Sequence, residues 1–211
     1  MSDDSGFSGI PTTTIGDLLG RERFMDTGIR PLWNGARLAG PAFTVRCAPN
    51  DNLMLHAAIY RAQPGSVIVV QCGDTDHALA GGNVCAIAHR RGVAGFVLDG
   101  LIRDIGEIRE LPFPVFGRGV IPKPAGKSAS SPFNEPVVCG GVTVHPGDVV
   151  VADEDGVAVV PVAAAGSVLA DARAILAREA AETLDDWERR HRALVAKRLA
   201  DNGFEDFEDG A

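Results

Sequence analysis

The strongest constraint on the fold is a short apolar segment, residues 66–71 (SVIVVQ). Its residues are β-branched and apolar on both faces of an extended chain, which is typical of a central strand. No G-x-G-x-x-G sequence follows it, and a chain of 211 residues has no room for eight strand–helix units. The segment therefore predicts a sheet that belongs to neither a dinucleotide-binding fold nor a (β/α)₈ barrel.

Helices and strands alternate around this segment and then give way to a β-rich stretch. Helical patterns are predicted at residues 15–21, 52–62 and 82–91, and strands at 37–47, 93–98 and 114–116. Four more strands are predicted between residues 137 and 160, followed by a helix reaching about residue 200. We therefore expect an α/β fold of layered mixed sheets flanked by helices, with a long C-terminal helix.

Composition limits the domain count and the class of partner. The chain can form one well-buried domain, which we place at residues 12–200 with the terminal helix from about 162. A flexible segment (1–11) would precede it and a disordered acidic tail (201–211) would follow. The net charge of −8 disfavours nucleic acid as a partner, and the lack of a long apolar run disfavours a membrane span. With no secretory signal at the N-terminus, we expect the chain to be cytoplasmic.

The candidate functional groups lie at the two ends of one helix–strand unit. The glycine pair Gly81-Gly82 precedes a segment of helical periodicity. A helix that begins there directs free backbone N–H groups at whatever lies in front of it, and glycine lets an anion approach the main chain. A short apolar strand comes next, followed by Arg103-Asp104 and, one helical turn later, Glu107. The unit predicts an anion-binding helix start and a charged cluster.

Each of these patterns also has a common structural explanation. An Arg-Asp-x-x-Glu sequence is often a solvated helix start, where acidic side chains are favoured. A glycine pair is often only a turn. His77 lies close to Asp74 and Asp76 in the sequence, and we interpret these groups as surface polarity rather than a metal site. The four cysteines show no C-x-x-C spacing and are predicted to be reduced, buried thiols.

Several segments in order resemble one family, the RraA-like proteins. This family includes the regulator of ribonuclease E activity A and metal-dependent 4-hydroxy-4-methyl-2-oxoglutarate/4-carboxy-4-hydroxy-2-oxoadipate aldolases. The resemblance covers roughly residues 12–180. It rests on residues 40–45 (GPAFTV), 64–70 (PGSVIVV), 80–83 (AGGN), 91–100 (RGVAGFVLDG), 102–104 (IRD) and 136–161.

A small pattern divides this family. One group of aldolases has Asp, then twenty residues, then Arg-Asp. Another group has Gly in place of that first Asp, and an acidic residue three positions after the aspartate of the Arg-Asp pair. Gly82, the pair Arg103-Asp104 and Glu107 match the second group, which is similar to pyruvate aldolases and oxaloacetate decarboxylases. Regulator-type members tend to lack the second acidic group.

The resemblance has implications for fold, assembly and activity. It implies a swivelling β/β/α type of fold, a homotrimer or a hexamer built as a dimer of trimers, and an active site at a subunit boundary. The implied activity is a divalent-metal-dependent pyruvate aldolase that also decarboxylates oxaloacetate, with both reactions passing through a metal-stabilised pyruvate enolate. The alternative is a non-catalytic regulator of ribonuclease activity that acts by protein binding. The long loop at 117–135 is expected to cover a site or to pack on a partner.

The residues themselves support the same chemistry. A hard cation such as Mg²⁺ or Mn²⁺ takes oxygen ligands and keeps several waters, so one or two carboxylates suffice. Asp104 would bind the metal directly, and Glu107 would either bind it directly or hold a metal-bound water. Arg103 would clamp the carboxylate of a small 2-oxo acid through its planar fork. Backbone N–H groups at the helix start would hold the same substrate. These groups belong to Gly81, Gly82, Asn83 and Val84. No side chain stands out as the general base.

Overall fold

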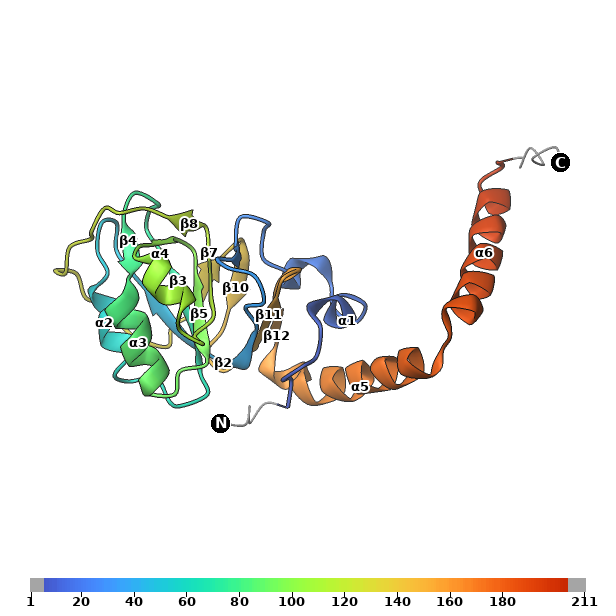
Figure 1. The fold of residues 1–211 in the computed structure, drawn as a ribbon, viewed down its shortest axis with the longest axis horizontal. Helices are drawn as coiled ribbons and strands as arrows, with labels where there is room; N and C mark the ends of the chain where they lie inside the picture. The colour runs from blue at the N-terminus through green and yellow to red at the C-terminus, as the bar shows by residue number, and fades with distance from the viewer. Residues whose placement is uncertain (1–5, 205–211) are drawn as a thin grey trace. The chain divides into compact units, whose positions relative to one another are not determined.

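The computed structural model describes residues 6–204, and its central layer is a mixed seven-stranded sheet (Figure 1). The strands, in order across the sheet, are β1 (Arg30–Pro31), β7 (Val115–Gly117), β5 (Gly95–Leu98), β3 (Val67–Gln71), β2 (Leu38–Arg46), β11 (Val149–Asp153) and β12 (Gly156–Val160). The four strands from β7 to β2 are parallel, whereas β1, β11 and β12 pair antiparallel to their neighbours. The predicted central strand is confirmed, because β3 lies between β5 and β2.

Two smaller sheets complete the layers. One is parallel and three-stranded, with the order β4 (Ala78–Ala80), β6 (Leu101–Ile102) and β8 (Gly119–Val120). The other is the hairpin of β9 (Val137–Cys139) and β10 (Val142–Val144). With the helices that flank them, these sheets confirm the predicted α/β fold of layered mixed sheets.

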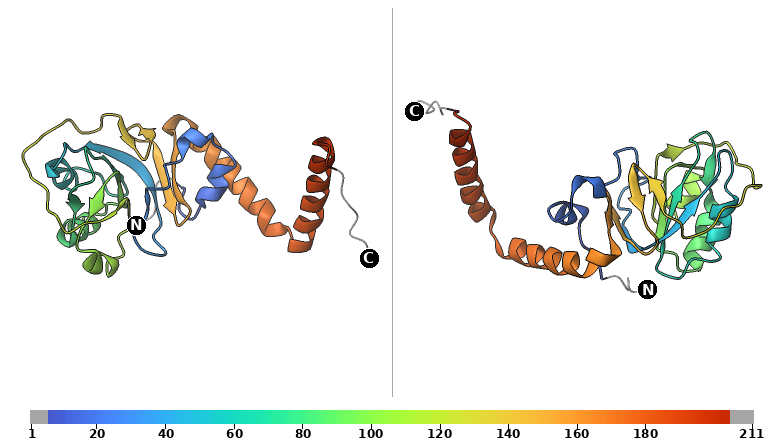
Figure 2. Two further views of the ribbon diagram at one scale, coloured as in Figure 1. Left: turned by 90° about the horizontal axis from the view of Figure 1, so that it is seen from above. Right: turned by 180° about the vertical axis from the view of Figure 1, so that it is seen from behind.

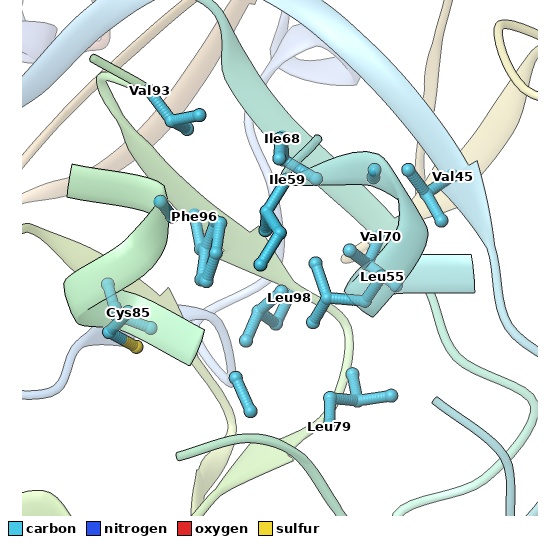
Figure 3. Close-up of a cluster of buried hydrophobic side chains, with 14 of the residues drawn as sticks. Val45, Leu55, Ile59, Ile68, Val70, Leu79, Cys85, Val93, Phe96 and Leu98 are labelled. Atoms are coloured by element: carbon cyan, nitrogen blue, oxygen red, sulfur yellow. The ribbon is translucent and has the colours of Figure 1, made fainter. Parts of the chain in front are cut away.

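Two helices cover one face of the central sheet. They are α2 (Leu53–Ala58) and α3 (Gly82–Arg90), which lie side by side in Figure 1. Figure 3 shows Leu55 and Ile59 at α2 and Cys85 of α3 over Phe96 and Leu98 of the sheet, all at most 2% exposed. Burying each large apolar side chain stabilises the fold by about 1.5–3 kcal/mol. This packing holds the first residue of α3, and therefore the glycine pair, in a fixed place.

The other face of the sheet carries a second core. Alternate residues of β3 divide between the two faces, with Ile68 and Val70 in the core under the helices and Val67 and Val69 in the other. The second core also contains residues of the β9–β10 hairpin, such as Val144. Because β3 is buried on both sides, its sequence shows no polar alternation.

The first helix differs from the prediction of residues 15–21. It is α1 (Thr12–Gly16), followed by a short 3₁₀ helix at Arg21–Arg23. Thr12 binds the buried carboxylate of Asp153 on β11, with 2.9 Å from its backbone N–H and 2.5 Å from its hydroxyl. Figure 2 shows α1 in blue beside the β11–β12 hairpin in orange. A contact across 141 positions sets this helix start, so local sequence did not reveal it.

The terminal helix predicted from about residue 162 is interrupted. A 3₁₀ turn (Val162–Ala164) leads into α5 (Ala165–Ala181), and a separate helix α6 (Leu184–Asp201) follows. Thr183 has an extended backbone, and its hydroxyl accepts a hydrogen bond of 3.2 Å from the Asp186 N–H. A helix cap of this kind starts a new helix, which explains the break.

The chain contacts divide into two compact units, residues 1–172 and 173–211. In the first unit, Val168 and Ala172 of α5 are buried. In the second unit, Trp187 stacks on His191 with ring centroids 4.4 Å apart.

The structure describes only parts of the two terminal segments that were expected to be flexible or disordered. Of residues 1–11, those from 6 onward are described, and Phe7 and Ile10 are 1% and 8% exposed. Most of the expected acidic tail, residues 205–211, lies outside the described part. Across residues 6–204, no helix has both the length and the apolar character needed to cross a membrane.

Candidate active site

The pairing of β4 with β6 brings the two predicted site segments together. These strands are parallel, and Ala80 lies opposite Ile102, 22 positions later in the chain. The Arg103 N–H then donates to the Ala80 carbonyl at 2.9 Å, which extends the pairing by one residue. The chain therefore leaves both strands at the same edge, with Gly81 beside Arg103. The twenty residues between Gly82 and Arg103 form the helix and strands that return the chain to this edge.

Asp104 turns its carboxylate back towards the glycine pair. Its backbone is left-handed, with φ of 59°, and it stands at the N-terminal end of α4 (Ile105–Arg109). Its Oδ2 atom accepts a hydrogen bond of 3.3 Å from the Gly82 N–H and lies 3.4 Å from the Arg103 Nε atom. The left-handed region is unfavourable for a residue with a side chain by roughly 1–2 kcal/mol. The surrounding structure holds this backbone in place, and the carboxylate, arginine and helix start meet at one point.

The glycine pair leaves space that two carboxylates occupy. A Cβ atom on Gly81 would fall well inside contact distance of the Asp104 Oδ2 atom. A Cβ atom on Gly82 would overlap the Glu107 Oε2 atom in the same way. Neither glycine has a positive φ, so what these positions require is room for the two acidic side chains. The Asp104 and Glu107 carboxylates therefore both lie against the backbone at the start of α3.

A small cleft of about 90 Å³ opens at this point. Five of the seven predicted site residues line it: Gly81, Asn83, Val84, Arg103 and Asp104. The two others, Gly82 and Glu107, contact this group without lining the cleft. We call this space the Asp104 cleft. The side chains of Arg103 and Asp104 are 45% and 40% exposed, so both groups are open to a ligand.

The structure adds three lining residues with polar or charged side chains that the sequence did not single out. They are Asn52 and His56 from the segment at α2, and Lys127 from the long loop after β8. Burial lowers the pKa of the His56 imidazole, and the positive charges of Lys127 and Arg103 lower it further. The one available signal was the long loop itself, which was expected to cover a site.

His77 is buried, so its interpretation as surface polarity is wrong. It is 1% exposed, its Nδ1 atom lies 2.7 Å from Asp74 Oδ1, and its Nε2 atom lies 4.0 Å from Cys72 Sγ. These three potential ligand atoms lie within 4.8 Å of one another. However, the Asp74 carboxylate also accepts backbone hydrogen bonds from Asn50 at 2.7 Å and Asp76 at 2.9 Å. The contacts of Asp74 hold the loop before β4 in place, and this structural role explains the cluster without a metal ion.

All four cysteines are free, as predicted, but the prediction that all four are buried is wrong for Cys72, which is half-buried. Cys47, Cys85 and Cys139 are buried, and burial raises the pKa of the Cys47 and Cys85 thiols to about 12. Such thiols stay protonated and unreactive at neutral pH.

A larger cavity of about 380 Å³ lies elsewhere, between the N-terminal segment and β11. Its lining includes Phe7, Ile10, Arg37 and Asp153. The Asp153 carboxylate is already bound by Thr12, and none of the predicted site residues lies there. The predicted site residues therefore lie at or beside the Asp104 cleft and not at this cavity.

Comparison with known proteins identifies the family. A family model described as RraA-like, Aldolase/RraA, matches residues 12–159, which is more than half of the chain. The chain belongs to the RraA-like family. The resemblance found from the glycine pair and the Arg-Asp pair is thus confirmed.

Aldolase names and RraA names both occur among the relatives. One relative, from Halalkalibacterium halodurans, is named "Putative 4-hydroxy-4-methyl-2-oxoglutarate aldolase"; it is 43% identical over 168 residues, covering 79% of this chain and 80% of the relative. The solved structure of Streptomyces coelicolor RraAS2, described as an unusual member of the RNase ES inhibitor RraA protein family, has a TM-score of 0.71. It is 32% identical, with 89% of this chain and 95% of that chain covered. The RNA-processing inhibitor RraA from Thermus thermophilis, also 32% identical, has a TM-score of 0.66, with 72% and 92% covered.

Proposed function

We propose that this protein is a divalent-metal-dependent lyase that releases pyruvate from 4-hydroxy-4-methyl-2-oxoglutarate or 4-carboxy-4-hydroxy-2-oxoadipate and decarboxylates oxaloacetate. The observation that carries the proposal is the contact of Asp104 with both the Gly82 N–H and the Arg103 side chain in one cleft. The aldolase names of relatives support a lyase.

The donor set fits a hard divalent cation. Asp104 and Glu107 offer carboxylate oxygens, the ligands that Mg²⁺ and Mn²⁺ prefer, and the bare backbone at Gly81 and Gly82 gives both carboxylates room. When bound, such a cation supplies Lewis-acid polarisation of the 2-oxo group.

The chain's own groups would bind and orient the substrate. Arg103 presents a planar fork to the carboxylate next to the 2-oxo group. The first turn of α3 leaves backbone N–H groups without partners inside the helix, and two residues of this turn, Asn83 and Val84, line the cleft. These donors stabilise negative charge on the substrate without rearrangement.

One arrangement serves both reactions. When C3–C4 breaks, the bonding electrons move towards C2 and negative charge builds on the 2-oxo oxygen. Loss of CO₂ from oxaloacetate places the same charge there, so the α3 N–H groups would stabilise both transition states while Arg103 holds the adjacent carboxylate. In the aldol cleavage, the 4-hydroxyl proton leaves to water, and in both reactions pyruvate C3 takes a proton from water.

The direct test is pyruvate release from both substrates with Mg²⁺ or Mn²⁺, followed by the same assay with a chelator. Asp104→Asn should lower kcat/KM by more than about 100-fold, because losing an outer-shell partner alone typically costs 10–100-fold. Asp17→Asn, at the exposed end of α1, is the matched control and should behave as wild type. Equal activity with and without chelator, or no pyruvate from any substrate, contradicts the proposal.

A second candidate function is regulation of a ribonuclease by protein binding. The descriptions of the Streptomyces and Thermus structures favour it. Binding to an RNA-degradation enzyme that persists in Asp104→Ala, together with no pyruvate release, would support this candidate over the lyase.

The proposal includes assembly into a homotrimer or a dimer of trimers. The family resemblance supports this assembly, and analytical ultracentrifugation measures it directly. A monomer at assay concentrations would exclude a shared active site.

A further inference from the structure

Two cysteines stand side by side where the paired strands β2 and β3 end. Val45 of β2 lies opposite Val70 of β3, and both side chains belong to the core under α2 and α3. Cys47 and Cys72 each follow these residues by two positions, so the alternation of side chains places them on the same face. The Cys47 N–H donates to the Gln71 carbonyl at 2.9 Å, which continues the pairing past the strand ends, and both cysteines pack on this core.

The strand pairing brings the two cysteines within reach of a covalent bond. Paired strands lie about 4.8 Å apart, and a disulfide spans Cα atoms that are roughly 4.4–6.8 Å apart. Both thiols are free in the structure. We propose that Cys47 and Cys72 form a redox-active dithiol, which a hydroperoxide converts into a disulfide within the chain. This inference goes beyond the proposed function and does not depend on it.

A cavity of about 240 Å³ gives an oxidant access to the pair. Both cysteines line this cavity, together with Arg46 and residues 129–131 of the long loop after β8. Cys47 is 2% exposed, whereas Cys72 is half-buried. An oxidant that enters the cavity therefore meets Cys72 first, and Cys47 serves as the second thiol.

His77 and Asp74 favour the reaction of Cys72. The Asp74 carboxylate lies 2.7 Å from the His77 Nδ1 atom and holds the ring proton there, which leaves Nε2 as an acceptor. The Nε2 atom lies 4.0 Å from the Cys72 Sγ atom. Burial raises the pKa of the Cys72 thiol, and a neighbouring base that takes the thiol proton counteracts this effect.

Oxidation by hydrogen peroxide takes place in two balanced steps. The Cys72 sulfur attacks one peroxide oxygen, the O–O bond breaks, and the departing hydroxide takes the thiol proton, so a sulfenic acid and one water form. The Cys47 sulfur then attacks the Cys72 sulfur, the S–O bond breaks, and the departing hydroxide leaves with the Cys47 proton as a second water. Two electrons have passed from the two sulfurs to the peroxide.

The high pKa of Cys47 protects it from reagents in solution more than from its neighbour. Burial raises this pKa to about 12, so roughly one Cys47 thiol in ten thousand is ionised at pH 8. A well-oriented group in the same molecule acts at an effective concentration of roughly 10⁵ M or more, which offsets the small ionised fraction. A dilute reagent has no such advantage. Cys47 should therefore react with oxidised Cys72 and with little else.

Mass spectrometry of the folded protein tests the inference. Wild type is treated with hydrogen peroxide at pH 8, then unfolded, alkylated at its remaining thiols and digested. A peptide pair joined through Cys47 and Cys72 should appear, and a thiol reductant added before alkylation should remove it. Cys85 and Cys139 are internal controls and should be recovered in the alkylated form. Absence of the joined pair, or equal amounts of pairs that contain Cys85 or Cys139, would overturn the inference.

Two single variants separate the roles of the two thiols. Cys47→Ala should leave Cys72 as a sulfenic acid that dimedone traps, because the second thiol is missing. Cys72→Ala should leave Cys47 reduced under the same conditions, because the accessible thiol is missing. Circular dichroism checks that each variant is folded, and the peptide pair of wild type decides the matter if one is not. Oxidation of Cys47 in folded Cys72→Ala, or no trapped Cys72 in folded Cys47→Ala, contradicts the two-step reaction. None of these measurements reads pyruvate release, so their outcome is independent of the lyase proposal.

Discussion

The carboxylate of Glu107 occupies the space that a side chain on Gly82 would need. The two residues come from different helices, since Gly82 begins α3 and Glu107 lies in α4. Glycine at this position therefore determines where an acidic group of the candidate site can lie.

Gly82→Ala should displace Glu107 and weaken the site without unfolding the protein. The overlapping atom is the far end of an exposed, flexible side chain, so we expect the free energy of unfolding to change by less than about 1 kcal/mol. The Mg²⁺ concentration for half-maximal activity should rise about tenfold, as for other disturbed metal ligands. Gly106→Ala is the control, because a Cβ atom there has no neighbour within 4 Å. Unchanged Mg²⁺ dependence in Gly82→Ala would separate Glu107 from metal binding.

Arg103→Lys should reduce activity although it keeps the positive charge. Lysine cannot form the two parallel hydrogen bonds of a guanidinium, and we expect kcat/KM to fall about tenfold, mainly through KM. We expect no larger loss of kcat/KM because the Arg103 side chain is 45% exposed, and water weakens its interaction with a ligand. Arg109→Lys, in the last turn of α4, should leave steady-state kinetics unchanged. Identical losses in the two variants would exclude a specific role for Arg103.

Asp51→Asn should release the loop that carries Lys127. The Asp51 carboxylate accepts hydrogen bonds from Leu53 at 2.8 Å, from Ser128 at 2.5 Å and from Ala129 at 3.0 Å. The N–H₂ group of an asparagine side chain would face some of these backbone N–H groups and could not accept their hydrogen bonds, so the loop should open more often. Hydrogen–deuterium exchange at residues 126–129 should become faster in Asp51→Asn and stay unchanged in Asp17→Asn. Full protection in Asp51→Asn would show that other contacts hold the loop.

The same carboxylate predicts a pH dependence of stability. Burial raises the pKa of Asp51, but hydrogen bonds from Ser128, Leu53 and Ala129 outweigh it, so the pKa is lowered in the folded protein. A lowered pKa means that the group stabilises the fold above its unfolded pKa of about 4, and that this contribution disappears as the pH falls through the folded pKa. Urea unfolding of wild type and Asp51→Asn should therefore differ at pH 6 and converge in acid. A difference that stays constant down to pH 2 would contradict this.

Local sequence predicted the parts of the fold that depend on local patterns. The apolar segment at 66–71 is the central strand β3, and the glycine pair begins α3. The site spacing could also be counted in the sequence, because the chain between Ala80 and Ile102 holds the helix α3 and the strand β5 that return it to the strand paired with β4. These features depend on hydrophobic pattern and on chain length, which a sequence displays directly.

The features that were missed depend on contacts between distant residues. Thr12 starts a helix because Asp153 binds it, and Lys127 reaches the cleft because Asp51 holds the residues that follow it. A single sequence shows the partners in each of these two pairs separately and gives no signal that they meet. His77 is a different case, because Asp74 is only three positions away and what the sequence did not show is the burial of the His77 side chain.

Direct measurement of Mn²⁺ binding tests the central claim most closely. Electron paramagnetic resonance of Mn²⁺ titrated with the protein should show about one bound ion per chain for wild type and for Glu110→Gln, a change at the exposed end of α4. Asp104→Asn should lose this binding and pyruvate release together. Unchanged Mn²⁺ binding in Asp104→Asn, or no binding by wild type at saturating Mn²⁺, would contradict the account.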